Sequence, residues 1–424
     1  MAKTFREWAP EQSVMFPATP LDLVEKEDVV HFVRNLVREE LDLSEVLEKY
    51  QEERGYPPFH PAMMTALLLY SYTQGIYASR RMARACRQRV DYMALTGMQK
   101  PDFRTISLFR QRHLKALGGL FRQVLQLCKK AGLVKLGHVA MDGTRMRANA
   151  SKHKGMSYGR MKKVEPDLDA EVQRWFEEAE RQDREEDELY GPDRQGDELP
   201  DWVADKQKRL EKIRQAKAEL EAEARAAAEA EPDPNKNSHK AKSTGVPEDK
   251  AQRNFTDPES RIMKTADGFI QGYNAQAAVD AAGQIIVAEL VTNSGSDMQQ
   301  MIPLLNQIRQ NLGRQAKEVS ADSGYCSALN LKTLRKRRIR GYVATDGRKK
   351  NVSYWIGQMR QRLNQGGSRS RYRFRKQTVE PVFGQIKSAR GFRQFLLRGF
   401  DQVTQEWSLL CTAHNLLKLA ALSE

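Results

Sequence analysis

The chain has 424 residues, of which 40% are hydrophobic and 29% charged, and its formal net charge is +15. This length allows roughly two to four domains with buried cores. The apolar runs are too short to span a bilayer, and the four cysteines are scattered without a Cys-x2-Cys pair, which argues against a membrane-embedded, secreted or zinc-finger protein and favours a reduced, basic, cytoplasmic one.

The charge is unevenly distributed along the chain. Residues 161–250 contain 17 Lys or Arg and 26 Asp or Glu, a net charge of −9, whereas the rest of the chain carries +24. Residues 331–400 contain 20 basic residues against two acidic ones, Asp346 and Glu380. Like charges at this density repel one another unless a polyanion lies across them. We therefore expect nucleic acid as the partner, in preference to a membrane or a merely solvated surface.

The first 132 residues are predicted to form an all-α domain. Apolar residues at helical spacing run through residues 28–50, 62–74, 79–95 and 102–117. The last two segments are basic and flank a Gly/Pro turn, which is typical of a helix-turn-helix that binds DNA, although a plain helical packing domain shows the same pattern. Thr105 is the expected cap of the last helix. The candidate DNA contacts are Arg80, Arg81 and Arg84, which surround an apolar stripe, and Arg104 and Arg110, which are expected to be exposed.

After residue 132 the pattern changes to alternating short strands and helices. A charged helical segment interrupts it at residues 161–230, and a polar, Pro-containing linker follows at residues 231–250. The predicted strands cover residues 136–141, 268–279, 284–291, 318–321 and 341–344, with a hairpin turn at Asp280-Ala-Ala-Gly283. The predicted helices cover residues 296–312, 329–338, 371–390 and 404–422.

This order of elements predicts an α/β fold with a mixed sheet of the ribonuclease-H type. We expect a helical N-terminal domain at residues 1–132 and the first part of a catalytic core at 133–160. An acidic helical insertion with its linker occupies 161–250, and the second part of the core, with basic C-terminal helices, occupies 251–424. The insertion is equally compatible with a dimer contact and with a spacer.

Two aspartates follow predicted strands at Gly-containing turns. Asp142 and Asp322 would meet at one edge of the sheet if their strands are adjacent. A third carboxylate, Glu380, comes from an otherwise basic helix. Convergent carboxylates bind Mg²⁺, and two such ions about 4 Å apart promote phosphodiester cleavage. Each acid taken alone is more simply explained as a turn residue or as a neutralising charge.

The helix that carries Glu380 also carries cations. Lys376, Glu380 and Lys387 recur at helical spacing, with Tyr372 on the same stripe and Arg375 adjacent to it. These cations could hold the phosphate backbone beside a metal. Pro381 indicates a kink or a helix start near the site.

Four motifs follow one another in the sequence: Val139-Ala-Met-Asp-Gly-Thr144, Gly272-Tyr-Asn-Ala-Gln276 with Ala278-Val-Asp280, Ala321-Asp-Ser-Gly-Tyr325, and Thr378-Val-Glu-Pro-Val-Phe-Gly384. Together they resemble a bacterial insertion-sequence transposase of the DDE type, in the IS1182-like group of the IS4/IS5 class, over essentially the whole chain. The resemblance implies a ribonuclease-H-like core in which Asp142, Asp322 and Glu380 form the catalytic triad and bind Mg²⁺, for which Mn²⁺ substitutes.

The resemblance also implies partners and an activity. The expected activity is metal-dependent cleavage at transposon ends, followed by strand transfer into target DNA. The expected partner is double-stranded DNA, both the terminal inverted repeats and the target, bound by a homodimer at the bacterial nucleoid. Of the signature Tyr-x2-Arg-x3-Glu-x6-Lys, Glu380 and Lys387 match, whereas Lys376 stands in the Arg position and Arg373 in the Tyr position, next to Tyr372.

Alternatives remain for both the site and the function. Asp257, Asp280 and Asp297 could compete as metal ligands, but a loop, a hairpin turn and a helix start explain them structurally. A DNA-binding regulator that no longer cuts, or a nuclease of the same fold without strand transfer, would share most of these features.

Overall fold

The structure is a computed structural model that describes residues 19–50, 58–190, 201–229, 245–265, 268–346, 353–366 and 371–422. By its internal contacts the chain divides into two compact units. The first contains Met1–Leu133 and Ser408–Glu424, and the second contains Val134–Trp407. None of the described helices is both long and apolar enough to cross a membrane.

The described N-terminal residues of the first unit are helical, without a strand between residues 19 and 133. The elements are a 3-10 turn η1 and six helices: η1 (Pro20–Leu23), α1 (Val29–Glu39), α2 (Ser44–Leu47), α3 (Pro61–Thr73), α4 (Ser79–Gln88), α5 (Val90–Leu95) and α6 (Phe103–Lys130). α1 begins where the Asp28 carboxylate accepts a 2.8 Å hydrogen bond from the amide of Val30. α3 is buried along nearly its whole length, as its continuous apolar sequence predicts.

The basic helices differ from the expected helix-turn-helix. Residues 79–95 form two helices because Arg89 adopts an extended backbone (φ −113°, ψ 130°) between α4 and α5. The prediction that Thr105 caps the last helix of this region is wrong. The cap is Asp102, whose carboxylate accepts hydrogen bonds from the amides of Arg104 and Thr105 at the start of α6. α6 also continues 13 residues beyond its expected end at Leu117, to Lys130, because a buried apolar stripe persists along it.

The last helix, α13 (Phe400–Ala420), crosses the boundary between the units. The expected core extended to residue 424, but residues from Ser408 onward group with the N-terminal helices. Within the first unit, the Sγ atom of Cys128 on α6 lies 3.8 Å from the carbonyl oxygen of Asn415 on α13. The C-terminal apolar helix therefore completes the helical unit instead of the expected catalytic core.

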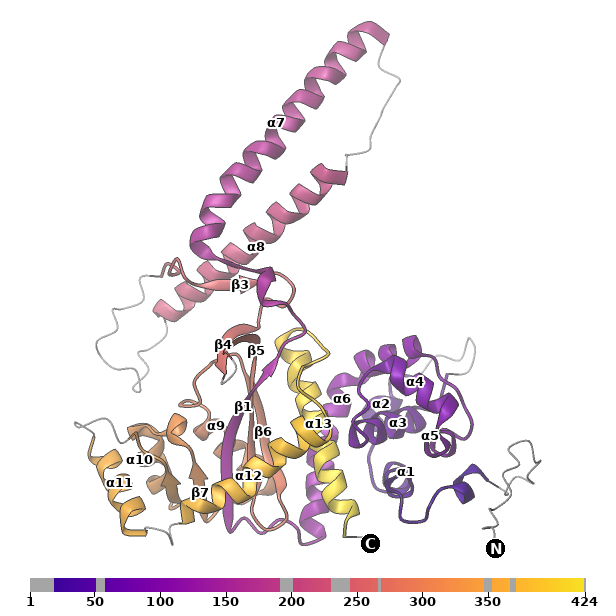
Figure 1. The fold of residues 1–424 in the computed structure, drawn as a ribbon, viewed down its shortest axis with the longest axis vertical. Helices are drawn as coiled ribbons and strands as arrows, with labels where there is room; N and C mark the ends of the chain where they lie inside the picture. The colour runs from indigo at the N-terminus through magenta and orange to yellow at the C-terminus, as the bar shows by residue number, and fades with distance from the viewer. Residues whose placement is uncertain are drawn as a thin grey trace, which may run out of the picture. The chain divides into compact units, whose positions relative to one another are not determined.

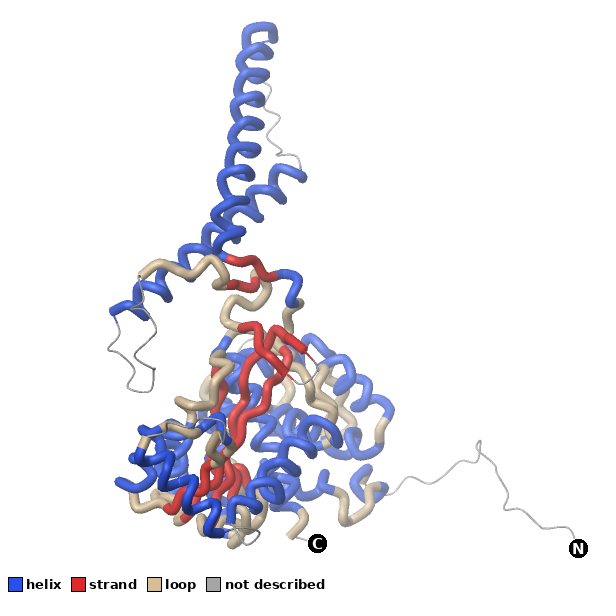
Figure 2. The backbone as a smooth tube through the Cα atoms, turned by 60° about the vertical axis from the view of Figure 1, so that its left-hand side comes forward, coloured by secondary structure: helices blue, strands red, loops and turns tan. Residues whose placement is uncertain are grey.

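The second unit is built on a six-stranded mixed sheet, coloured red in Figure 2. Its strands are β1 (His138–Arg147), β4 (Arg261–Thr265), β5 (Gly268–Asp280), β6 (Ile285–Thr292), β7 (Glu318–Ala321) and β8 (Arg340–Val343). The order is β4-β5-β1-β7-β8, and β6 pairs with β5 beside β4. β5 runs antiparallel to β1 and β6, whereas β1, β7 and β8 are parallel. The predicted hairpin is confirmed, and the mixed sheet is consistent with a ribonuclease-H-like core.

Helices cover both faces of this sheet (Figure 1). α9 (Met301–Leu312) packs on β5 and β6, and α10 (Ala328–Lys336) and α11 (Tyr354–Gly366) pack on β8. A 3-10 turn η5 (Arg371–Arg373) leads into α12 (Phe374–Gly384), which packs on β1, β5 and β7, and a π-helical turn (Gln385–Ala389) follows it. The predicted elements did not include β4 and α11.

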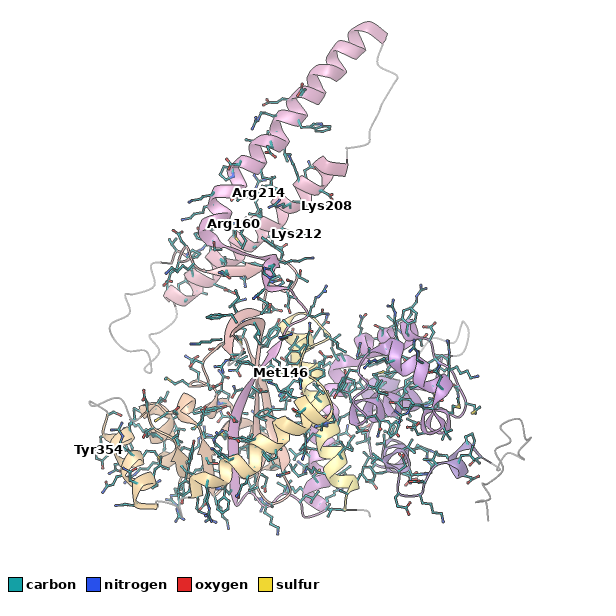
Figure 3. All side chains as sticks on the ribbon, in the orientation of Figure 1. Met146, Arg160, Lys208, Lys212, Arg214 and Tyr354 are labelled. Carbon is teal, nitrogen blue, oxygen red and sulfur yellow. The ribbon has the colours of Figure 1, made fainter. Side chains whose placement is uncertain are left out.

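The charged insertion forms a helical arm. α7 (Tyr158–Tyr190) and α8 (Asp201–Glu229) lie side by side, and the short antiparallel strands β2 (Gly155–Ser157) and β3 (Gln252–Asn254) pair at their base (Figures 1 and 2). Figure 3 labels some of the cations on its surface. A small apolar cluster holds the pair together: Met156, Tyr158, Met161, Leu168, Leu210, Ile213, Ala216 and Leu220. Most of the expected linker, residues 231–244, lies outside the described residues.

Candidate active site

Asp142 and Asp322 are neighbours at one edge of the sheet. The parallel pairing of β1 with β7 ends at Met141 opposite Ala321, and each aspartate is the next residue along the chain. Asp142 does not end β1 as expected, because β1 continues to Arg147 against the long antiparallel strand β5. Since β7 stops at Ala321, the edge beside Asp142 is open. The topology therefore brings both carboxylates to the same place.

Arg375 links Glu380 to Asp142 by hydrogen bonds to both carboxylates. Arg375 Nη1 donates to Asp142 Oδ2 at 2.6 Å, and its Nη2 donates to Glu380 Oε1 at 3.0 Å. The Arg375 and Asp142 side chains are mostly buried, with exposed fractions of 11% and 17%, whereas that of Glu380 is 47% exposed. A buried guanidinium that bridges two carboxylates is a strong, geometrically specific contact. α12 is thereby fastened to β1 at the candidate site.

Pro381 does not break the helix that carries Glu380. It lies inside α12, where it cannot donate to the carbonyl of Gln377 four residues earlier. The side chain of Gln284, in the turn between β5 and β6, donates to that carbonyl at 3.1 Å. The freed acceptor is thus satisfied from the sheet, which explains how a proline is accommodated next to Glu380.

Asp297 also belongs to the site, contrary to its expected role at a helix start. α9 begins at Met301 after the N-cap residue Gln300. The Asp297 Oδ1 atom instead accepts hydrogen bonds from the side-chain amides of Asn274 (2.7 Å) and Gln276 (2.6 Å) on β5. Gln276 in turn accepts a hydrogen bond from the hydroxyl of Tyr325. The missed signal was the alternation of Asn274 and Gln276, which puts two amides on one sheet face.

Two glycines allow this close packing. A Cβ atom on Gly143 would overlap Gln276 Nε2 and would lie 2.7 Å from Asp297 Oδ1. A Cβ atom on Gly324 would lie 3.0 Å from Asp322 Oδ1 and 3.1 Å from Asp297 Oδ2. Gly143 is not in the expected turn but lies within β1. Its lack of a side chain leaves room for Asp297.

The aspartates lie in an environment that opposes their ionisation. The pKa of Asp142 is raised to about 6, chiefly by burial and also by the charge of Asp322, against the lowering effect of Arg375. Burial also raises the pKa of Asp322, and the negative charge of Asp297 adds to this shift. Closely spaced, partly buried carboxylates of this kind favour the binding of a cation.

Two family profiles match parts of the chain. The sequence profile of a family described as a transposase DDE domain matches residues 239–416, which include Asp322 and Glu380. A second profile, described as a transposase domain (DUF772), matches residues 19–112. No curated protein and no solved structure matches the chain. Together the two matches indicate an insertion-sequence DDE transposase. Asp142 lies outside the matched residues, so its assignment rests on the pairing of β1 with β7.

The residues of the transposase site have the donor chemistry for Mg²⁺. Carboxylate oxygens from one or two residues, supplemented by water, are its usual protein ligands, and Asp142, Asp322 and Glu380 would supply them. Among the described residues no three His, Cys, Asp or Glu side chains are close enough together to hold a metal as they stand. Arg375 already places a positive charge between Asp142 and Glu380, so a cation fits there once the arginine moves.

The other DNA-binding residues predicted around α12 do not all lie on one helical stripe. Arg375 is three residues after Tyr372, so the pair keeps the Tyr-x2-Arg spacing of the signature, with one extra residue before Glu380. Lys376 is exposed. Lys387 lies in the π-helical turn, where its ammonium donates to the Arg145 carbonyl at 2.9 Å. The expected single helical stripe from Lys376 to Lys387 is therefore interrupted.

Of the arginines predicted to contact DNA in the first unit, four are exposed and one is buried. Arg80, Arg81, Arg84 and Arg104 are exposed. Arg110 was expected to be exposed and is instead buried, donating at 3.0 Å to the carbonyl of Tyr77 and at 3.4 Å to the hydroxyl of Tyr72. Its predicted DNA contact is withdrawn, because its position on the inward face of α6 makes it a core residue.

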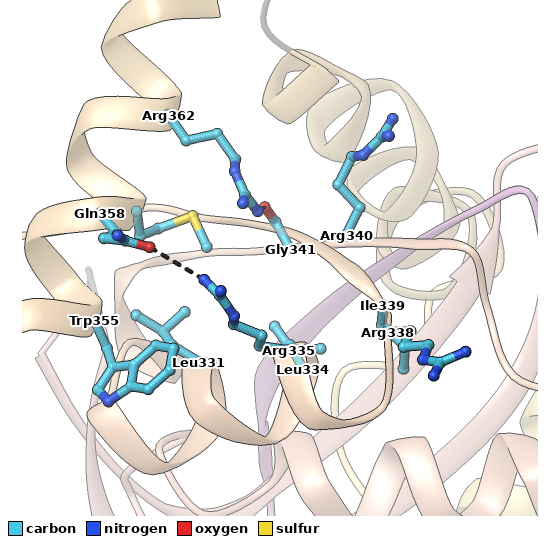
Figure 4. Close-up of a pocket in the computed structure, with 11 residues that line it drawn as sticks. Leu331, Leu334, Arg335, Arg338, Ile339, Arg340, Gly341, Trp355, Gln358 and Arg362 are labelled. Carbon is cyan, nitrogen blue, oxygen red and sulfur yellow. Dashed lines mark hydrogen bonds between the residues drawn. The ribbon is translucent and has the colours of Figure 1, made fainter.

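Two hollows are lined by arginines. One, of about 460 Å³, lies between α4 and the start of α6, and its lining residues include Arg80, Arg84, Arg87 and Arg104. The other, of about 270 Å³, lies between α10, α11 and β8 (Figure 4). Figure 4 shows Arg335, Arg338, Arg340 and Arg362 around it, with the indole of Trp355. Both hollows have the charge that a phosphate backbone requires.

Proposed function

We propose that the transposase cleaves DNA at the ends of an insertion sequence in a divalent-metal-dependent reaction and transfers the cut strand into target DNA. The observation that carries this proposal is the meeting of Asp142 and Asp322 at adjacent strand ends, with Glu380 brought to Asp142 by Arg375. The match to the transposase DDE domain supports it independently.

The proposed roles follow from the chemistry of the side chains. Asp142, Asp322 and Glu380 would hold the metal, Mg²⁺ or Mn²⁺, which when bound supplies charge stabilisation to the reacting phosphate. Arg375 would exchange its carboxylate partners for phosphate oxygens, which match its planar guanidinium equally well. Tyr372 and Lys376 would hold the phosphates beside it. Lys387 would hold the phosphate backbone from its position against the backbone of Arg145.

Double-stranded DNA is the proposed partner. The arginine-lined hollow of α4 and α6 would bind the terminal inverted repeat, with Arg80, Arg81, Arg84 and Arg104 contacting phosphates. The second hollow would contact DNA near the catalytic core. Because an insertion sequence has two ends, a homodimer would hold one end in each copy. Such a substrate would place the transposase on the DNA of the bacterial cytoplasm.

The test is a cleavage and joining assay with the purified full chain. A labelled duplex containing a transposon end is incubated with a target plasmid, either in Mg²⁺ or in EDTA. Asp142→Asn, Asp322→Asn and Glu380→Gln are run in parallel, with Asp401→Asn as an exposed control in the same unit. We expect metal-dependent nicking and joining that the three variants lose, with DNA binding kept within about threefold.

Each other outcome contradicts part of the proposal. Nicking without joining would identify a nuclease of the same fold. Tight binding without cleavage in either Mg²⁺ or Mn²⁺ would identify a regulator that no longer cuts. Retained cleavage in one of the three variants would remove that residue from the catalytic site.

A further inference from the structure

The further inference concerns Asp297, which approaches the catalytic edge from the side opposite Arg375. Successive residues of a strand point to opposite faces, so Asp142 and Gly143 face different sides of β1. Arg375 binds Asp142 on the side of α12. Asp297 precedes α9 and lies where a side chain of Gly143 would be. The catalytic edge therefore has a cation on one side and a fourth carboxylate on the other.

The local structure around Asp297 does not require a carboxylate there. The N-cap of α9 is Gln300, and the backbone carbonyl of Asp297, not its side chain, accepts the 2.9 Å hydrogen bond from the Gln300 amide. Asp297 forms no salt bridge with any Lys, Arg or His within the part of the chain that the structure describes. Two neutral amides donate to its Oδ1 atom, and a neutral asparagine oxygen could accept the same hydrogen bonds.

The other oxygen of Asp297 faces Asp322. Asp297 Oδ2 and Asp322 Oδ1 lie 3.1 Å and 3.0 Å from a single point, the position of a Cβ atom on Gly324. Arg375, which bonds to Asp142 and Glu380, makes no ion pair with either of these two aspartates. The charge of Arg375 lowers the pKa of Asp322, but without an ion pair there the two closely spaced negative charges still repel each other. A divalent cation between them would remove that repulsion.

We propose that Asp297 is a positioning residue of the catalytic centre, which holds Gln276 and Asn274 against Gly143 and whose negative charge strengthens divalent-cation binding beside Asp322. This inference rests on the proposed function. The Arg375 guanidinium restrains Asp142 and Glu380 in the free protein, so the side formed by Asp322 and Asp297 receives the cation first. The link from Gln276 to Tyr325 ties Asp297 to the turn that follows Asp322.

The test measures Mn²⁺ binding to the full chain without DNA, by calorimetric titration. Asp297→Asn keeps an acceptor for the two amides and removes only the charge, so we expect its Kd for Mn²⁺ to rise about tenfold or more while its Tm changes little. Asp401→Asn, which removes one exposed charge from the same unit, should leave the Kd within twofold. In an Asp322→Asn background, Asp297→Asn should have little further effect, because both residues act on one cation.

A second variant tests the position independently of the charge. Gly143→Ala places a methyl group against Gln276 and Asp297, and it should weaken Mn²⁺ binding as well. Gly357→Ala, on α11, is its control, because a methyl group there meets nothing within 4 Å. An unchanged Kd for Mn²⁺ in Asp297→Asn, or no Mn²⁺ binding by the unaltered protein, would overturn the inference.

The outcomes also separate the inference from the proposed function. A protein that never cleaves DNA but loses Mn²⁺ affinity in Asp297→Asn would overturn the function and keep the inference. An active transposase whose Mn²⁺ affinity and metal requirement for cleavage are unaffected by Asp297→Asn would keep the function and overturn the inference.

Discussion

Arg375 Nη1 donates a 2.6 Å hydrogen bond to Asp142 Oδ2 across 233 residues of sequence. The same guanidinium reaches Glu380 through its other terminal nitrogen. Two residues proposed to bind a metal are therefore joined by a fixed positive charge in the free transposase. A metal bound by Asp142 and Glu380 would displace this guanidinium, which would then be free to contact the phosphate of the substrate.

The first prediction is that Arg375→Gln moves the acid limit of cleavage to higher pH. The pKa of Asp142 is about 6, raised by burial and held down by Arg375, and a carboxylate must be ionised to bind a metal. Wild-type cleavage should fall as the pH drops through about 6, and the Gln variant should lose activity at a higher pH. The measurement is the cleavage rate between pH 5.5 and 8.5. Arg375→Lys, which keeps the charge, should restore most of the profile, and an acid limit that does not move in the Gln variant would contradict the prediction.

The second prediction concerns the stability of Asp142→Asn. The pKa of Asp142 in the folded protein, about 6, is above its ordinary value of 3.8, so the folded state binds the proton more tightly. Its ionised form therefore destabilises the fold increasingly as the pH rises from about 4 to 6, and fully above that. Asp142→Asn should stabilise the second unit by about 1–3 kcal/mol at pH 7.5 and by little at pH 4. Thermal unfolding at both pH values measures this, and an equal Tm difference at the two would disagree with it.

The third prediction is that the exposed arginines of α4 bind phosphates. Replacing Arg80 and Arg84 together with Gln should weaken binding to the transposon end by roughly tenfold or more and reduce the slope of log K against log salt by about 2. Arg38→Gln, an exposed change on α1 of the same unit, is the control for charge. Binding isotherms at several salt concentrations measure both quantities. If the slope stays the same, α4 serves only in helical packing.

The fourth prediction separates Arg110 from its exposed neighbours. Its guanidinium is buried and bonded to Tyr77 and Tyr72, so Arg110→Met should lower the stability of the helical unit by about 2 kcal/mol by leaving those groups without their donor. DNA binding at a temperature where the variant is folded should keep its wild-type salt slope. A reduced slope with unchanged Tm would show that Arg110 contacts phosphate after all.

Much of the fold could be predicted from local sequence patterns. The hairpin of β5 and β6, strand β7, helix α9 and the position of Asp322 directly after its strand were all predictable, because hydrophobic periodicity and turn residues act over a few residues. The end of β1 was not. Whether a strand stops at Asp142 or continues to Arg147 depends on the length of its partner β5, which lies more than a hundred residues away in the sequence.

The sequence by itself determined the family, the alternation of strands and helices, the basic character of residues 331–400 and the three candidate carboxylates. Only the tertiary structure decided which charges meet. It paired Arg375 with Asp142 and Glu380 and buried Arg110. It also placed Asp297 in the space that Gly143 leaves free and grouped the end of α13 with the helical unit. The physical reason is that periodicity is set by neighbours in the chain, whereas a side chain's partner and burial are set by strand order and helix packing, which bring distant residues together.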